Sequence, residues 1–168
     1  MNFIKLIIAM LILYVGFLYY SRPEMEISAD NFVKIIKAGS PDFAISRNKV
    51  NGANLAYSAV NNNKRIKIDY INFESPEAAH LYYMDFINSS TDKHQQKISR
   101  DIRINKPTAE KQSYLDGYTY KIAIYAKNTV IVSSTGDDNM LNVNDIFNEL
   151  YKPVEFDFSN IESYKLKL

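Results

Sequence analysis

The chain has 168 residues, the length of one globular domain with a short appendage. Charged residues make up 23% and aromatic residues 13%, a balance that excludes an intrinsically disordered chain. The net charge of +1 lacks the basic excess that is typical of nucleic-acid-binding domains, so we expect no nucleic-acid partner. Cysteine is absent, which excludes disulfide scaffolds, thiolate metal sites and cysteine nucleophiles.

The N-terminal segment is the strongest signal in the sequence. Residues 6–20 carry no charge, and Phe3 and Ile4 extend this apolar run if Lys5 directs its ammonium toward lipid headgroups. As a helix, residues 3–20 rise about 27 Å, close to the ~30 Å hydrocarbon core of a bilayer. The sequence therefore predicts a membrane anchor or signal segment over residues 1–21, with residues 3–20 in contact with the membrane.

Two other interpretations of this segment stay open, a cleaved signal that would release a secreted protein and a buried N-terminal helix. A signal peptide needs small residues at its cleavage site. Cleavage after Ser21 would place Tyr19 at the third position back, and cleavage after Ala29 would place Ile27 there. Because both side chains are too bulky, we favour an uncleaved, single-pass anchor.

The charges that flank the apolar run indicate its orientation. Lys5 and the α-amino group precede the run, whereas Arg22 is offset by Glu24 and Glu26 after it. Excess positive charge stays on the cytoplasmic side of a membrane. We therefore expect the domain that follows to be extracytoplasmic.

Residues 22–152 are expected to form one globular domain. Ser28 suits a helix N-cap, Pro76 suits the first position of a helix, and Asn51-Gly52 suits a type I′ hairpin turn. In chain order, the patterns predict a helix from Ser28 to Gly39, strands over 43–50, 53–60 and 64–73, a helix over 76–87, strands over 97–104, 118–126 and 129–135, and a helix over 144–151. Residues 105–117 are expected to be a polar connection. Residues 153–168 are expected to form a C-terminal edge strand or tail.

The order of these elements indicates the fold class. Strands joined by tight turns make an antiparallel sheet, and amphipathic helices must bury their apolar side against it. The order α-βββ-α-βββ-α thus predicts an α+β fold, namely a two-layer domain with the helices on one face of the sheet.

The chain lacks the common catalytic and cofactor motifs, and we expect no cofactor and no metal. His80 and His94 are 14 residues apart and share no metal-ligand spacing. The acidic stretch at Asp137 lacks the glycine and the glutamate that a calcium loop requires. An enzyme would have to use His80 with a carboxylate such as Asp69 or Asp85.

The tyrosines are the remaining candidates for a binding site. Four of the 13 lie close together in the sequence, at Tyr114, Tyr118, Tyr120 and Tyr125. On an uncovered sheet face they would form a recognition patch, because tyrosine is enriched at interfaces. The alternative, which we favour, is that they pack beneath helices as ordinary strand residues.

These observations support three hypotheses of function. The first is a membrane-tethered, extracytoplasmic domain that binds an envelope protein or wall component without catalysis. The second is a carrier of a small apolar ligand. The third, least supported, is a hydrolase that uses His80 with a nearby carboxylate.

Overall fold

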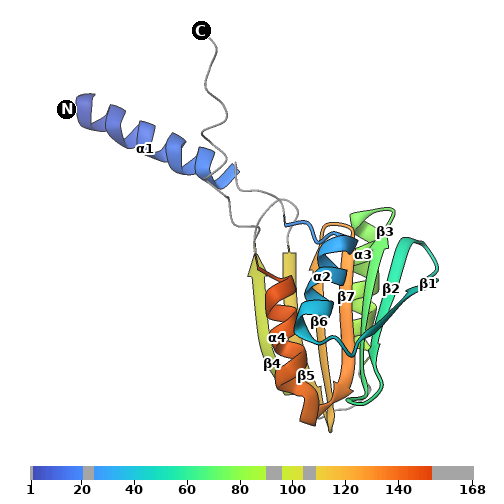
Figure 1. The fold of residues 1–168 in the computed structure, drawn as a ribbon. Coiled ribbons are helices and arrows are strands. Elements are labelled where there is room, and N and C mark those ends of the chain that lie inside the picture. The colour runs from blue at the N-terminus through green and yellow to red at the C-terminus, as the bar shows by residue number, and fades with distance from the viewer. Residues whose placement is uncertain (1, 21–24, 90–95, 104–108, 153–168) are drawn as a thin grey trace.

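The computed structural model describes residues 2–20, 25–89, 96–103 and 109–152, and the fold is α+β (Figure 1). Seven antiparallel strands form one sheet in the order β1-β2-β3-β7-β6-β5-β4. The helices are α1 (Asn2–Tyr20), α2 (Ala29–Gly39), α3 (Pro76–Asn88) and α4 (Met140–Leu150), and a 3₁₀ turn (Asp137–Asn139) precedes α4. The strands are β1 (Ala44–Asn48), β2 (Ala53–Asn61), β3 (Ile66–Phe73), β4 (Gln96–Arg103), β5 (Ala109–Asp116), β6 (Thr119–Ala126) and β7 (Thr129–Gly136).

Helix α1 covers the segment for which an anchor is predicted. Its large apolar side chains that the structure describes are 48% to 73% exposed; they are Ile7, Ile8, Met10, Leu11, Ile12, Leu13 and Tyr14. Within the described part of the chain, no helix is both long and apolar enough to cross a membrane. The anchor over residues 3–20 therefore stays a prediction.

The predicted starts of α2 and α3 are confirmed, whereas α4 begins at Met140, four residues before the expected Asn144. The Ser28 hydroxyl accepts a hydrogen bond from the backbone N–H of Asn31, 3.2 Å away, and so caps α2. The Ser75 hydroxyl caps α3 in the same way, and Pro76 occupies the first turn. Each cap accepts a hydrogen bond from a first-turn amide that has no partner within the helix. The two serines therefore fix the residues at which α2 and α3 begin.

The hairpin at Asn51-Gly52 forms, but it is not the predicted type I′ turn. The N–H of Ala53 bonds to the carbonyl oxygen of Val50, which closes the turn. Gly52 has a φ of +76°, whereas Asn51 keeps a negative φ, and a type I′ turn needs both to be positive. The strand before the turn ends at Asn48, two residues earlier than expected.

The predicted polar connection over residues 105–117 is wrong, because Ala109–Asp116 form strand β5. This strand lies inside the sheet, where it pairs with β4 on one side and β6 on the other. Two of its buried residues, Gln112 and Ser113, are polar. These polar residues hide the alternation that would mark a strand. The order after α1 is therefore α-βββ-α-ββββ-α.

The prediction that all helices cover one face of the sheet is also wrong. Helices α2 and α4 pack on one face, and α3 packs on the other face against β3, β6 and β7 (Figure 1). The domain thus has three layers, helix on sheet on helix. The physical reason is that the central strands are apolar on both sides, as in Val130, Ile131 and Val132 of β7.

The two faces carry separate apolar cores. The face under α2 and α4 holds the larger core, to which the predicted α4 stripe contributes Val143, Ile146, Phe147, Leu150 and Tyr151. The face under α3 holds a smaller core around Ala79 and Tyr83. The expected C-terminal edge strand or tail over residues 153–168 lies outside the described residues.

Candidate functional site

The four candidate tyrosines do not share one surface. Tyr114 is buried beneath α3, where its hydroxyl donates a hydrogen bond to the Phe86 carbonyl oxygen at 3.2 Å. Tyr120 is buried on the opposite face of the sheet, under α2 and α4. Tyr125 is half-buried beside α3 and donates to the Pro76 carbonyl oxygen at 3.4 Å. Tyr118 is 86% exposed on the β5–β6 turn.

The burial of Tyr114, Tyr120 and Tyr125 raises the pKa values of their hydroxyl groups. Desolvation and, to a smaller extent, the nearby charge of Asp116 raise the pKa of Tyr114 to about 12. Desolvation raises the pKa of Tyr120 and of Tyr125 as well. Of the four, only Tyr118 is freely available for recognition, so the structure does not assemble a tyrosine patch.

The histidine that an enzyme would need is not paired with a carboxylate. His80 is exposed on α3, with its ring edge-on to Tyr125 at a centroid distance of 5.3 Å. Among the described residues, no hydrogen bond or ion pair joins His80 to Asp69 or Asp85. The Asp69 carboxylate instead accepts from the Ser58 hydroxyl at 2.5 Å and pairs with Lys67 at 2.8 Å. This arrangement gives no acid–base pair at His80.

Metal ligation finds no support in the described part of the chain. There, no three His, Cys, Asp or Glu side chains gather in a way that could hold a metal ion. Asp138 and Asn139 have a structural role, because the Asn139 amide bonds to Asp138 and to the Lys64 carbonyl oxygen at 2.9 Å. His94 lies outside the described residues.

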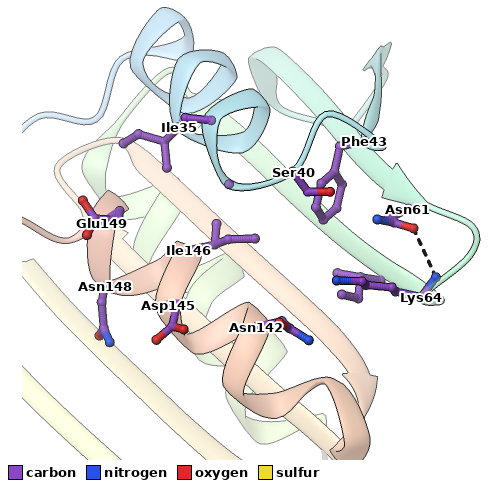
Figure 2. Close-up of a pocket in the computed structure, with 13 residues that line it drawn as sticks. Ile35, Ser40, Phe43, Asn61, Lys64, Asn142, Asp145, Ile146, Asn148 and Glu149 are labelled. Carbon is purple, nitrogen blue, oxygen red and sulfur yellow. Dashed lines mark hydrogen bonds between the residues drawn. The ribbon is translucent and has the colours of Figure 1, made fainter.

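The structure instead contains a groove between α2 and α4, which we call the α2–α4 groove (Figure 2). Its volume is about 530 Å³, within the range of small-ligand sites. Four separate segments form its walls, namely the end of α2, the loop that follows it, the β2–β3 turn and α4. The lining residues are Ile35, Ala38, Gly39, Ser40, Phe43, Asn61, Lys64, Ile66, Asn142, Asp145, Ile146, Asn148 and Glu149.

The floor of the groove is apolar and its rim is polar. Phe43, Ile66 and Ile146 are all buried members of the larger core, and each also lines the groove. The contact between the two helices is close at one end, where an added Cβ on Gly39 would lie 3.3 Å from Ile146. A groove of this kind offers apolar area to a ligand and leaves polar contacts to its edges.

Asn61 supplies the distinctive polar feature of the groove. The residue is 1% exposed, and its Oδ1 accepts the backbone N–H of Lys64 at 3.1 Å within the β2–β3 turn. Its Nδ2 is buried and has no hydrogen-bond partner. In Figure 2 the oxygen faces Lys64 and the nitrogen faces the other way, toward Phe43. A buried donor without a partner costs about 1–3 kcal/mol, and an aromatic ring is only a weak acceptor.

Some charged residues on the rim of the groove have a charged or polar partner, and others do not. Glu149 pairs with Lys152 at 2.5 Å, and the Asn148 side chain accepts from Lys111 at 2.5 Å. Within the described residues, neither Lys64 nor Asp145 forms an ion pair. Figure 2 shows Lys64 extending from the turn toward α4. The groove therefore holds a cation and an amide donor on the same turn, each without an anionic partner.

A second hollow, of about 620 Å³, follows the β1–β2 hairpin. All of its lining comes from one hairpin, residues 47–50 and 53–56, and most of that lining is exposed or half-buried. It offers neither an apolar floor between elements nor a buried unpartnered donor. We therefore place the candidate site in the α2–α4 groove.

Sequence reasoning missed this groove. Asn61 lies between the predicted strands 53–60 and 64–73, where asparagine is an ordinary turn residue, and such a residue gives no sign that its amide nitrogen will be buried. Comparison with protein-family models, curated proteins and solved structures gives no significant match to this chain. The site therefore rests on its own geometry, which suits noncovalent binding of a small apolar group.

Proposed function

We propose that this chain is a membrane-tethered, extracytoplasmic binding domain without catalytic activity, and that the α2–α4 groove is its binding site. The observation that carries the binding role is the buried, unpartnered Asn61 amide nitrogen beside the apolar floor of the groove. An occupant that offers an acceptor there removes the cost of the unpaired donor. The same occupant covers the apolar floor and gains hydrophobic free energy.

The tether is supported by the sequence and by the surface of α1. Residues 3–20 are nearly free of charge, and the described apolar side chains of α1 are exposed rather than packed. Exposed apolar surface of this extent favours contact with lipid or another apolar partner. The charges around the segment favour the outward orientation of residues 22–168.

The size of the groove favours a small occupant over a large protein interface. A stable protein partner needs about 800 Å² of contact on each side, which a single groove does not supply. The carrier hypothesis is thus combined with the tethered-domain hypothesis, since a tethered domain can present or hold a small apolar ligand. His80 is exposed and has no carboxylate partner among the residues that the structure describes, so it lends no support to the hydrolase alternative.

The absence of cysteine allows a direct test of groove occupancy. Single cysteines are introduced by Ala38→Cys, which lies in the groove, and by Lys37→Cys, which is exposed beside it on the same helix. Maleimide labelling rates are compared between native membranes and the purified, washed full chain. We expect Ala38→Cys to react several-fold more slowly in native membranes, because an occupant covers it, and Lys37→Cys to react equally in both.

The contradicting outcome is equally clear. If both cysteines react at the same rate in native membranes and after purification, nothing occupies the groove where the protein works. The proposed binding site would then be wrong.

A further inference from the structure

We propose that the α2–α4 groove recognises the carboxylate of a small apolar acid, with Asn61 and Lys64 as the partners of that carboxylate. This inference rests on the proposed binding role of the groove and adds the chemical class of the ligand. It is carried by three features of the site, namely the orientation of Asn61, the unpaired Lys64 and the apolar floor.

The orientation of Asn61 is fixed by its own turn. Because Oδ1 accepts the Lys64 backbone N–H at 3.1 Å, the acceptor end of the amide is already used. The donor end is left over, buried and without a partner. An asparagine amide nitrogen can only donate, so whatever binds beside it must present an acceptor oxygen.

Lys64 adds a positive charge next to this donor. The two residues belong to the same turn, and both line the groove. In the described part of the chain the Lys64 ammonium has no anionic partner. Hydrogen bonds to a charged group are stronger than neutral ones, so a negatively charged acceptor is favoured over a neutral carbonyl.

The acidic residues of the rim do not cancel this preference. Glu149 is already neutralised by Lys152. Asp145 and Lys64 are both exposed, so solvent screens the two charges alike, and within the described residues they form no ion pair. The buried donor and the free ammonium thus define the anion-binding end of the groove.

The remainder of the ligand is apolar. Phe43, Ile66 and Ile146 form the floor, and the volume of about 530 Å³ accommodates a short acyl chain or a single amino-acid side chain. The carboxylate can therefore come from a free acid with an acyl chain or from the C-terminal residue of a peptide. Both sources present the same chemistry to Asn61 and Lys64.

The test uses the full chain in lipid nanodiscs, labelled with ¹⁵N at asparagine and followed by NMR. The ligand is sodium hexanoate, with hexan-1-ol as a control that has the same chain but no carboxylate. We expect hexanoate to move the Asn61 side-chain NH₂ signals saturably and hexan-1-ol to bind about tenfold more weakly. N-acetyl-leucine is titrated in parallel, and tighter binding of either acid identifies its source.

Three variants separate the groove donors from the general charge of the protein. Asn61→Asp retains the acceptor for the turn but loses the donor, and we expect it to abolish hexanoate binding. Lys64→Met keeps the length of the side chain and loses its charge, and we expect about tenfold weaker binding. Lys49→Met removes another exposed lysine, on the β1–β2 hairpin, and should leave binding unchanged.

Two results would overturn the inference. If hexan-1-ol binds as tightly as hexanoate and Lys64→Met has no effect, the groove binds apolar groups without recognising a carboxylate, and the proposed function survives alone. If the Asn61 signals do not respond to either acid, its donor is satisfied by water. The Ala38→Cys labelling experiment then decides independently whether the groove is occupied.

Discussion

Tyrosine hydroxyls in this protein tie the sheet to the chain segments that cover it. On the face beneath α3, Tyr114 donates to the Phe86 carbonyl oxygen. On the opposite face, Tyr70 donates to the Ile27 carbonyl oxygen at 3.0 Å, just before α2 begins. Each ring fills the core while its hydroxyl satisfies a carbonyl group that helix or strand pairing leaves open. The abundance of tyrosine is thus explained by packing as well as by its preference for strands.

The stability of the domain should therefore decline at alkaline pH. Below pH 10, Tyr114 is neutral in both the folded and the unfolded chain. Between pH 10 and about 12 the unfolded chain loses this proton and the folded chain keeps it, so the free energy of unfolding falls. Tyr114→Phe should flatten this decline and cost about 1 kcal/mol at neutral pH through the lost hydrogen bond.

Urea unfolding of residues 22–168 at several pH values measures this effect. Tyr118→Phe changes an exposed ring on the β5–β6 turn and is the matched control. An equal slope in Tyr114→Phe and in the unchanged protein would show that folding does not protect the Tyr114 proton.

At the scale of elements, local signals in the sequence were sufficient for most helices and turns. Ser28 and Ser75 mark the starts of α2 and α3 because a hydroxyl cap is a local interaction. The α4 stripe is buried as its spacing predicts. Strand β5 was not recognised, because Gln112 and Ser113 are polar and are buried only through the pairing of β5 with β4 and β6.

The sequence contains only one indication that α3 lies on the opposite face of the sheet from α2 and α4. The continuous apolar stretch Val130–Val132 in β7 is typical of a strand covered on both faces. In a two-layer domain, alternate residues of such a strand would face water. The groove could not be predicted at all, since its four walls come together only after folding.

The position of α3 gives a prediction for this element. Tyr83 is fully buried against the sheet, whereas Leu81 on the same helix is 65% exposed. Tyr83→Ala should lower the free energy of unfolding by about 3–5 kcal/mol, because it leaves a cavity in the smaller core. Leu81→Ala should change it by no more than about 0.5 kcal/mol. Thermal or urea unfolding of residues 22–168 compares the two, and equal losses would contradict the three-layer arrangement.

At the scale of the whole molecule, the charged residues lie almost entirely in residues 22–168, and the longest apolar run lies in residues 6–20. Residues 22–168 carry equal numbers of acidic and basic residues, while residues 6–20 carry none. A neutral domain does not depend on a polybasic face to reach a membrane, so the N-terminal segment would provide the attachment. The proposed function joins this attachment to a groove that is suited to a small apolar acid.

The location of the domain is the central claim, and cysteine labelling of intact cells tests it most directly. Leu81→Cys places a thiol on the exposed side of α3, away from the groove, and Asn2→Cys places one ahead of the apolar segment. We predict that a membrane-impermeant maleimide labels Leu81→Cys in intact cells, that the labelled chain stays with the membranes, and that Asn2→Cys reacts only after lysis. Protection of Leu81→Cys until lysis would place the domain in the cytoplasm, and labelled chain free in the medium would exclude the tether.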